Sequence, residues 1–506
     1  MSKYNINFKK IAWLTFTTYL ITTICGYFNL FLAHFSHKNY FPLKSYLIIF
    51  SNEQIKNIHE IQRGIYNLAG FKAIFNTNVP YKTIDNLFFI LISTTLVILF
   101  FVGYKVVQLN KITQREIIKW SIIFSLLMAF AIPENSSDLY YYIASGAQQS
   151  LYNQNPYITT LDQIKGYNKK SILLNDMWPL QPATYGPVFI YLTKLIVSLS
   201  CNNFFLSVIG FKLLNLTLFI FFILFLLKTH EAKNIYLVAW NPLILIQGLW
   251  NCHNDLISGI LISLALSLLT GGVKSKNYFW GVFCLTFAIG IKYVPIIIIP
   301  IIFLYIFKNL PKKNIFASTI LGFCFGIALI LICSVHYLFP LNQFNSEHLS
   351  KITTSIGYVH QSLIATIFTI VRYFCMAINI NCNLFQVDHF LKCFFYIVFG
   401  LFYLYVILGK KTDLTFDITL VLFVLFAFTI AKFHSWYLLN LIFLIPLLKE
   451  GILKNCLIAL SITHTYAITF LDQAKILNFT SLTLLPVLFI LFRRIKSKSR
   501  IISLND

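Results

Sequence analysis

The stretch Leu87–Val107, LFFILISTTLVILFFVGYKVV, decides the fold class of this chain. It carries one charged side chain, Lys105, among apolar and small polar residues. A helix needs about 20 predominantly apolar residues to cross the hydrocarbon core of a bilayer, so this stretch predicts a transmembrane helix. Comparable stretches recur along the 506 residues, and backbone groups within lipid must be hydrogen-bonded inside each segment. The sequence therefore predicts an all-α, polytopic transmembrane bundle with about 11–14 spans.

The composition agrees with a membrane protein and excludes an ordinary soluble one. Charged residues make up 11% of the chain and hydrophobic residues 58%, whereas soluble domains carry about 25% charged residues. The net charge of +23 would fit nucleic-acid binding if it were gathered on one soluble face. The basic residues instead lie in short loops between apolar stretches, where they set membrane orientation. We therefore expect membrane lipids around the chain and no nucleic-acid partner.

The basic loops also predict the sidedness of the chain. We expect a multi-pass protein of the plasma (inner) membrane with both termini on the cytoplasmic side. The chain has no sequence repeat and no soluble domain, so residues 1–506 are expected to form one integral membrane domain. The basic loop Lys111–Lys119 is expected inside, and the next span leads the chain outside at Pro133. Residues 134–185 are then an external loop with short interfacial helices.

The middle of the chain does not alternate cleanly between the two sides. Its short apolar pieces predict that one of Val188–Leu199 and Phe204–Leu227 does not span the membrane fully. A hairpin of two short helices over residues 235–270 places its tip, Trp250–Asp255, outside. Gln361–Met376 fits an outer interfacial helix better than a span.

Ten cysteines are scattered along the chain, most of them within apolar stretches. No CxxC pair and no Cys/His spacing typical of a metal site occurs. We therefore expect the cysteines to be small packing residues instead of disulfides or metal ligands, and we expect no metal and no cofactor.

Two acidic residues follow the predicted exit from the membrane, in a chain that has only 17 of them. Glu134 and Asp138 lie in the sequence ENSSDLYYY. A carboxylate there can accept a proton from an attacking hydroxyl group, while the neighbouring tyrosines hold sugar rings. The alternative is that the carboxylate caps a surface helix beginning at Ser137 or Asp138.

Two further segments combine helix-breaking residues with polar side chains. The Pro and Gly residues of Trp178–Pro187 indicate a rigid turn and a helix start, and a purely structural role is the alternative. Pro242 breaks an apolar stretch, and the polar run Asn251–Asp255 follows. Polar groups within a membrane are costly unless paired, which favours a functional role for this run. His253 and Asp255 alone are a weak metal signal and suit hydroxyl or phosphate recognition better.

The last two candidate sites are the isolated Lys292 and the segment Lys432–Tyr437. Lys292 is the one charged residue within Leu285–Tyr305. A buried ammonium needs an anion, which a lipid phosphate would supply, and snorkelling to the interface is the alternative. His434 and Trp436 lie in Lys432–Tyr437, which is expected at the outer surface, and an aromatic belt is the alternative there.

Together these motifs resemble the polyprenyl-phosphate-sugar-dependent glycosyltransferases of the GT-C superfamily, and within it the bacterial alpha-1,6-mannosyltransferase branch. Each motif alone is weak, but their order and spacing hold from about residue 130 to about residue 440. Asn251 and Cys252 depart from the pattern, because small residues usually precede the histidine, and the stretch before Asp85 has no counterpart. The matching motifs are Ser136–Tyr142, Gly146, Asn155–Tyr157, Tyr185–Val188, Asn241–Leu243, His253–Asp255, Ile291–Lys292 and Trp436–Leu438.

The resemblance implies transfer of a hexose, with mannose expected, from a polyprenyl-phosphate-linked donor to a glycan or lipid acceptor at the outer membrane face. It implies inversion without a nucleotide sugar or metal, with Asp138 as the general base. Glu134 is the reserve candidate, because it lies four residues earlier and on the same face if that segment is helical. A transporter or lipid flippase is the alternative, although such proteins favour several midplane charges and inverted repeats. The residues expected to contact substrate are Tyr140, Tyr142, Tyr157, Tyr185, His253, Asn254, Asp255, Lys292, His434 and Trp436.

Overall fold

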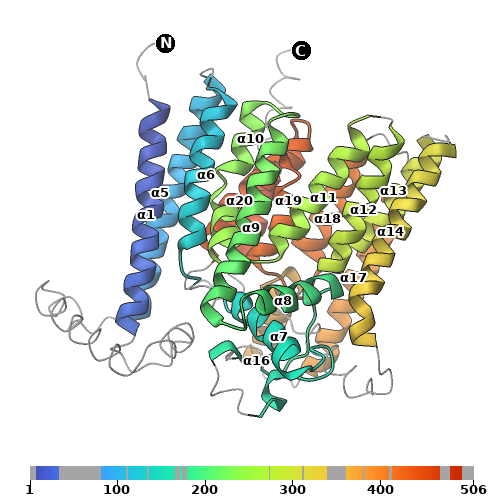
Figure 1. Cartoon of the computed structure of the whole chain (residues 1–506), viewed down its shortest axis with the longest axis horizontal. Helices are drawn as coiled ribbons and strands as arrows, with labels where there is room; N and C mark the ends of the chain where they lie inside the picture. Colours follow the sequence, from blue (N-terminus) through green and yellow to red (C-terminus); the bar gives the residue numbers. More distant parts are fainter. Residues whose placement is uncertain are drawn as a thin grey trace, which may run out of the picture. The chain divides into compact units, whose positions relative to one another are not determined.

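Helices form every regular element in the part of the chain that the structure describes, which confirms the predicted all-α fold class. The structure is a computed structural model (Figure 1). It divides into two compact units. Unit 1 comprises Met1–Thr184, Ile190–Ile220 and Leu245–His253, and unit 2 comprises Tyr185–Phe189, Phe221–Ile244 and Asn254–Asp506. The described residues are 7–33, 81–109, 112–133, 136–165, 171–173, 179–272, 274–309, 313–338, 361–378, 380, 382–409, 413–467 and 479–492.

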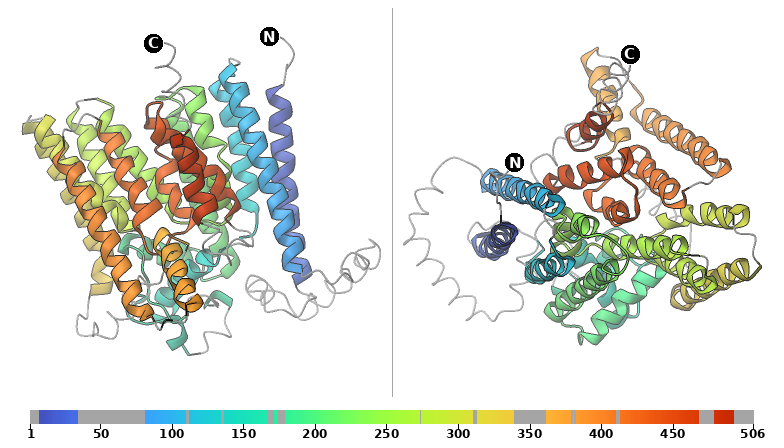
Figure 2. Two further views of the ribbon diagram at one scale, coloured as in Figure 1. Left: turned by 180° about the vertical axis from the view of Figure 1, so that it is seen from behind. Right: turned by 90° about the horizontal axis from the view of Figure 1, so that it is seen from above.

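Unit 1 contains three helices that lie side by side, α1, α5 and α6 (Figure 2). Trp13 of α1 packs edge-on against Trp120 of α6, with ring centroids 5.2 Å apart. The predicted transmembrane stretch Leu87–Val107 lies within α5. The described elements of this unit are α1 (Phe8–Ala33), α5 (Tyr81–Leu109), α6 (Gln114–Phe130), α7 (Asp138–Tyr152), η1 (Leu161–Gln163), η3 (Ser171–Leu173) and most of α8 (Pro187–Leu199), α9 (Phe204–Leu226) and η4 (Ile244–Trp250).

The helix α8 is too short to cross a bilayer. Its 13 residues extend about 20 Å at 1.5 Å per residue, against a hydrocarbon core of about 30 Å. The following helix, α9, has 23 residues and is long and apolar enough to span. The prediction that one of these two segments does not span fully is thus supported, with α8 as the short one.

The first helix of the predicted external loop, α7, packs tightly on α8. A Cβ atom at Gly146 would lie 2.4 Å from the Thr193 carbonyl oxygen, so the two backbones approach too closely for any side chain there. Gln149 Nε2 donates to the Ile190 carbonyl at 3.1 Å and to Thr193 Oγ1 at 3.2 Å. These contacts hold α7, which begins at Asp138, against a neighbouring helix.

Unit 2 is built around α12, which packs against both α11 and α14 (Figure 1). Its described elements are α10 (Ala232–Ala239), α11 (Asp255–Thr270), α12 (Ser275–Ile291), η5 (Val294–Ile297), α13 (Ile298–Asn309), α14 (Lys313–Leu338), α16 (Leu363–Ala377), α17 (Leu384–Leu408), α18 (Leu414–Val424), η7 (Leu425–Thr429), η8 (Ser435–Leu438), α19 (Leu439–Ile442), η9 (Ile445–Leu447), α20 (Ile452–Thr463), η10 (His464–Tyr466) and η12 (Thr480–Leu484).

The connection between α11 and α12 places two charged residues at one end of unit 2. A short turn joins the two helices, so α12 runs back alongside α11. Asp255 begins α11 and Lys292 directly follows α12, and both therefore lie at the end opposite this turn.

Four described helices contain a segment long and apolar enough to cross a membrane: Phe89–Leu109, Phe204–Leu226, Lys313–Val335 and Leu384–Leu408. A fifth span is possible if η4 and α11 count as one, because they meet at a bend of 117°. This bend lies at the predicted hairpin tip. The chain is thus a helical membrane protein, and the total of about 11–14 spans stays a prediction.

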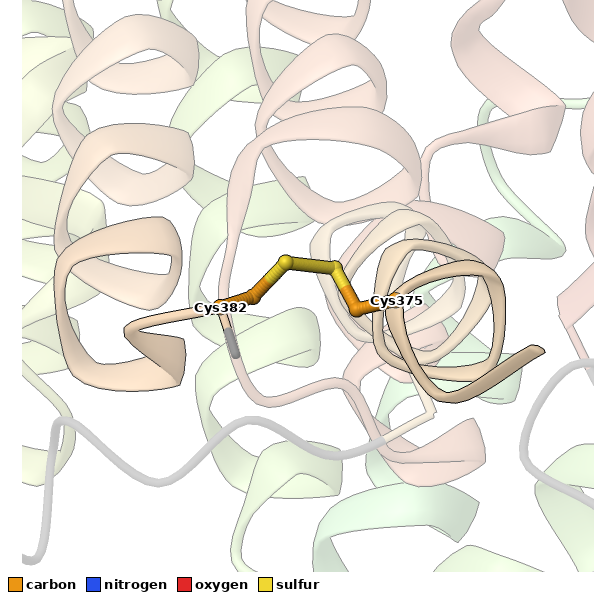
Figure 3. Close-up of a disulfide and its surroundings, with 2 residues drawn as sticks. All are labelled: Cys375 and Cys382. Carbon is orange, nitrogen blue, oxygen red and sulfur yellow. A yellow bond between two sulfur atoms is a disulfide. The ribbon is translucent and has the colours of Figure 1, made fainter. Parts of the chain in front are cut away.

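A disulfide links Cys375, in the last turn of α16, to Cys382 before α17 (Figure 3). The expectation that the cysteines form no disulfides is therefore wrong for this pair. The backbone turns after α16 and brings the two Cα atoms to 6.1 Å, within the range that a disulfide spans. The spacing of seven residues is not a recognisable cysteine motif, so the disulfide could not be predicted from the sequence. The helix α16 itself agrees with the helix predicted over Gln361–Met376.

Candidate active site

Asp138 is the first residue of α7, a few residues after α6 ends. The preceding residue, Ser137, occupies the N-cap position and makes no side-chain capping bond. The Asp138 amide donates to Ser136 Oγ at 3.2 Å. The Asp138 carboxylate lies in the first helical turn, where the positive end of the helix dipole stabilises its charge. The reserve candidate Glu134 lies outside the described residues, as does Trp178.

The Asp138 carboxylate lies beside the imidazole of His253. Asp138 Oδ2 is 3.2 Å from His253 Nδ1, and the two side chains are 13% and 0% exposed. Asp138 is thus partly accessible, whereas His253 is enclosed by protein. The prediction that the tip Trp250–Asp255 faces the same side as Asp138 is supported at His253.

A distorted chain segment carries His253 to this position. The element η4 is a π-helix, a form that is often associated with functional sites. Beyond it, Cys252 adopts a left-handed backbone conformation with φ of 60°, which is uncommon for a residue with a side chain. Asn215 Nδ2 donates to the carbonyls of Gly248 at 2.9 Å and His253 at 3.3 Å, so α9 holds both sides of the turn.

The tyrosines after Asp138 are enclosed by the protein. Tyr140 and Tyr142 are each 1% exposed. The Tyr140 hydroxyl donates to the Pro133 carbonyl at 2.9 Å, and its ring stacks on Phe204. Burial raises the pKa of Tyr141 above its usual range, so its hydroxyl stays protonated and donates to the Gln181 carbonyl. These contacts hold the loop together, and sugar binding by Tyr140 and Tyr142 stays a prediction.

A second polar cluster lies in unit 2 around Asp255. Lys292 Nζ donates to both Asp255 carboxylate oxygens, at 2.7 and 2.8 Å, and Asn440 Nδ2 donates to Oδ1 at 2.7 Å. Lys292 Nζ also lies 4.0 Å from the centre of the Tyr437 ring, a distance typical of a cation–π contact. The anion that Lys292 requires is thus Asp255. The neighbouring residue Asn254 is the N-cap residue of α11 and is buried.

The remaining predicted site residues lie in turns, loops or, for Trp436, the short helix η8. In unit 1, the Tyr157 amide donates to Asn155 Oδ1 at 3.0 Å, which explains the Asn-Pro-Tyr motif as a local turn. In unit 2, the Tyr185 carbonyl accepts from the Tyr293 hydroxyl at 3.2 Å. His434 stacks on Trp436 in the segment that leads to Tyr437, with ring centroids 4.3 Å apart.

Two polar residues of these clusters were not identified from the sequence. Asn440 follows the Trp-Tyr-Leu motif by two positions and contacts Asp255. Lys212 is a single charge within the apolar helix α9, and it is 6% exposed. An isolated lysine in an apolar run was the signal that selected Lys292, and the same signal applied to Lys212 would have found it.

No group of three His, Cys, Asp or Glu side chains within the described ranges could hold a metal ion.

Comparison with known proteins supports a membrane glycosyltransferase. Residues 65–308 match a family model described as alpha-(1->6)-mannopyranosyltransferase, N-terminal domain. The chain is also 26% identical over 208 residues to alpha-(1->6)-mannopyranosyltransferase A of Mycobacterium tuberculosis, a match that covers 38% of this chain and 37% of that relative. No solved structure matches the chain significantly. The resemblance to GT-C mannosyltransferases inferred from the motifs is therefore confirmed.

Proposed function

We propose that the chain transfers a mannosyl residue from a polyprenyl-phosphate-linked donor to a glycan or lipid acceptor at the outer membrane face. The mannosyltransferase matches support the sugar and the reaction class. The contact between the partly exposed Asp138 and the buried His253 is the main structural support for Asp138 as the general base. A carboxylate that is oriented from one side and open on the other suits proton transfer from a substrate hydroxyl group.

The reaction is a single displacement with inversion. The acceptor hydroxyl oxygen attacks the anomeric carbon, and the bond from that carbon to the phosphate oxygen breaks. The electron pair of that bond leaves with the polyprenyl phosphate, and the hydroxyl proton passes to Asp138. The phosphate gains one unit of negative charge as it leaves, and cationic side chains or helix N-termini can stabilise it.

The basic residues of unit 2 support the proposed outer location. Lys274 lies in the turn between α11 and α12, and Lys308 lies in the last turn of α13, one helix pair later. Basic loops of this kind favour the cytoplasmic side. Asp255 and Lys292 lie at the other end of α11 and α12, which supports an outer location for them.

The experiment is a transfer assay with purified protein in lipid nanodiscs and labelled polyprenyl-phosphate mannose, glucose or arabinose. We expect product from the mannose donor, and Asp138→Asn should lower kcat at least about 100-fold with little change in donor KM, because a general base contributes about 10²–10⁴-fold. If Asp138→Asn stays active while Glu134→Gln is inactive, the base is Glu134. Activity in both variants excludes both residues, and movement of an intact lipid-linked sugar without transfer supports a flippase.

A further inference from the structure

Lys212 is a buried lysine whose ammonium group is held by main-chain oxygens. It lies within α9 and is 6% exposed. Its Nζ donates to the carbonyls of Ala131 at 2.5 Å, Trp250 at 3.0 Å and Leu249 at 3.4 Å. Within the described ranges, no Asp or Glu forms an ion pair with it. All of these residues belong to unit 1.

The three carbonyls belong to the two segments that carry Asp138 and His253. Ala131 is the C-cap residue of α6, and the chain continues from it to Asp138. Leu249 and Trp250 end η4, and the chain continues from them to His253. The Trp250 indole also donates directly to the carbonyl of Ile132, so the same two segments are joined twice.

The charge of Lys212 suits this position. The last carbonyls of a helix have no partner within the helix and carry a partial negative charge. An ammonium group supplies three donors and a positive charge, whereas an apolar side chain would leave the carbonyls unsatisfied inside the protein. One turn further along α9, Asn215 holds the carbonyls of Gly248 and His253.

We propose that Lys212 is a positioning residue that sets the distance between Asp138 and His253 by tying the end of α6 to the end of η4. The inference rests on the proposed role of Asp138 as the base. A buried cation in this role makes no contact with substrate and acts through the main chain. Its loss should therefore lower kcat and leave donor binding nearly unchanged.

The test compares Lys212→Met with Lys212→Arg, which keeps the charge, and with Lys105→Met. The control makes the same chemical change at an exposed lysine of α5. We expect Lys212→Met to lower kcat about 10–100-fold, because small misplacements of a catalytic group have effects of this size. Donor KM should stay within about twofold, and Lys212→Arg should recover a large part of kcat. Lys105→Met should behave as the unmodified protein.

Amide hydrogen exchange gives a readout that does not depend on activity. In Lys212→Met, exchange of the main-chain amides of residues 138–142 and 249–253 should speed up at least about fivefold, because these segments lose a shared anchor. In the Asp138→Asn background, Lys212→Met should reduce kcat little further, since both changes act through the same group.

Unchanged exchange in both segments overturns the proposal, as does a kcat loss that is fully additive with Asp138→Asn. If Lys212→Met is not recovered folded, Lys212→Gln decides by the same two measurements. Full activity of Asp138→Asn overturns the proposed base instead, and the exchange result still shows whether Lys212 joins the two segments.

Discussion

Lys292 Nζ lies 2.7 Å from Asp255 Oδ1 and 2.8 Å from Oδ2, so one carboxylate neutralises the only charge of a long apolar run. The Lys292 side chain is 14% exposed and that of Asp255 is 1% exposed. The ammonium group thus has an internal counter-ion and still reaches the protein surface. A structural ion pair and a phosphate ligand are both consistent with this geometry, and two substitutions separate them.

Lys292→Met should raise the donor KM at least about tenfold if Lys292 binds the donor phosphate, because a buried charge-assisted contact contributes strongly to binding. Asp255→Asn is the matched variant, since it keeps the shape of the side chain and leaves the lysine charge uncompensated. It should lower thermal stability while the donor KM stays the same or falls. Donor titrations of initial rates give both values. An unchanged KM in Lys292→Met, or an equal rise in both variants, would show that the pair has a structural role.

His253 has two possible roles. The sequence indicated that it binds substrate, whereas its contact with Asp138 in the structure suits a residue that orients the Asp138 carboxylate. If His253 orients the Asp138 carboxylate, His253→Ala should lower kcat at least about tenfold, with donor and acceptor KM values within about threefold. His253→Asn keeps a side-chain nitrogen near the position of Nδ1 and should recover part of the rate. A rise in KM with unchanged kcat would instead favour substrate binding. Steady-state kinetics with both substrates varied give the answer.

Gly186 should be intolerant of a side chain. A Cβ atom there would lie 2.2 Å from the carbonyl oxygen of Gly290, and the Gly186 amide donates to the Ile291 carbonyl at 3.0 Å. Because the obstacle is backbone, Gly186→Ala must separate the Tyr185 turn from the end of α12 at a cost of about 1–3 kcal/mol. Gly400→Ala in α17 is the control, since nothing lies within 4 Å of its added Cβ. The thermal unfolding temperature should fall for Gly186→Ala alone.

The sequence predicted the features that depend on local pattern. The apolar stretches and the break before Asp255 are visible in hydropathy and in the placement of Pro and polar residues. The same pattern indicated that one of Val188–Leu199 and Phe204–Leu227 does not span fully, but it left open which one. The order of motifs identified both Asp138 and His253, but the sequence assigned them separate roles. Their contact depends on how α9 packs on η4, through Lys212 and Asn215, and such packing has no local signal.

Contacts between residues far apart in the sequence could not be predicted either, because they also depend on how the helices pack. The need of Lys292 for an anion followed from the cost of a buried charge, yet Asp255 and Asn440 become its neighbours only when α11, α12 and α19 pack together. Asp255 was identified as a polar residue at a break, without its partner. The disulfide between Cys375 and Cys382 depends on the turn after α16, which cysteine spacing alone does not predict.

The disulfide indicates on which side of the membrane Cys375 and Cys382 lie. Disulfides persist in oxidising compartments and are rare in the cytosol. The pair lies at the start of α17. Lys410 and Lys411 follow this helix in the sequence and lie outside the described residues, and the positive-inside rule predicts that they are cytoplasmic. The basic residues and the disulfide therefore both predict that Cys375 and Cys382 face the outer side.

In intact cells, a membrane-impermeant maleimide should label Cys375 and Cys382 only after treatment with a membrane-impermeant reductant, as read by peptide mass spectrometry. Cys375→Ser should lower the free energy of unfolding by about 2–3 kcal/mol, the range expected for closing so short a loop in the unfolded chain. Cys393→Ser is the control, because Cys393 is an exposed free cysteine of α17 and its loss should change stability by less than about 0.5 kcal/mol. Labelling without reduction would show that the disulfide does not form in the cell. Labelling that requires permeabilised membranes would place this end of α17 in the cytoplasm and overturn the outer location of the unit 2 cluster.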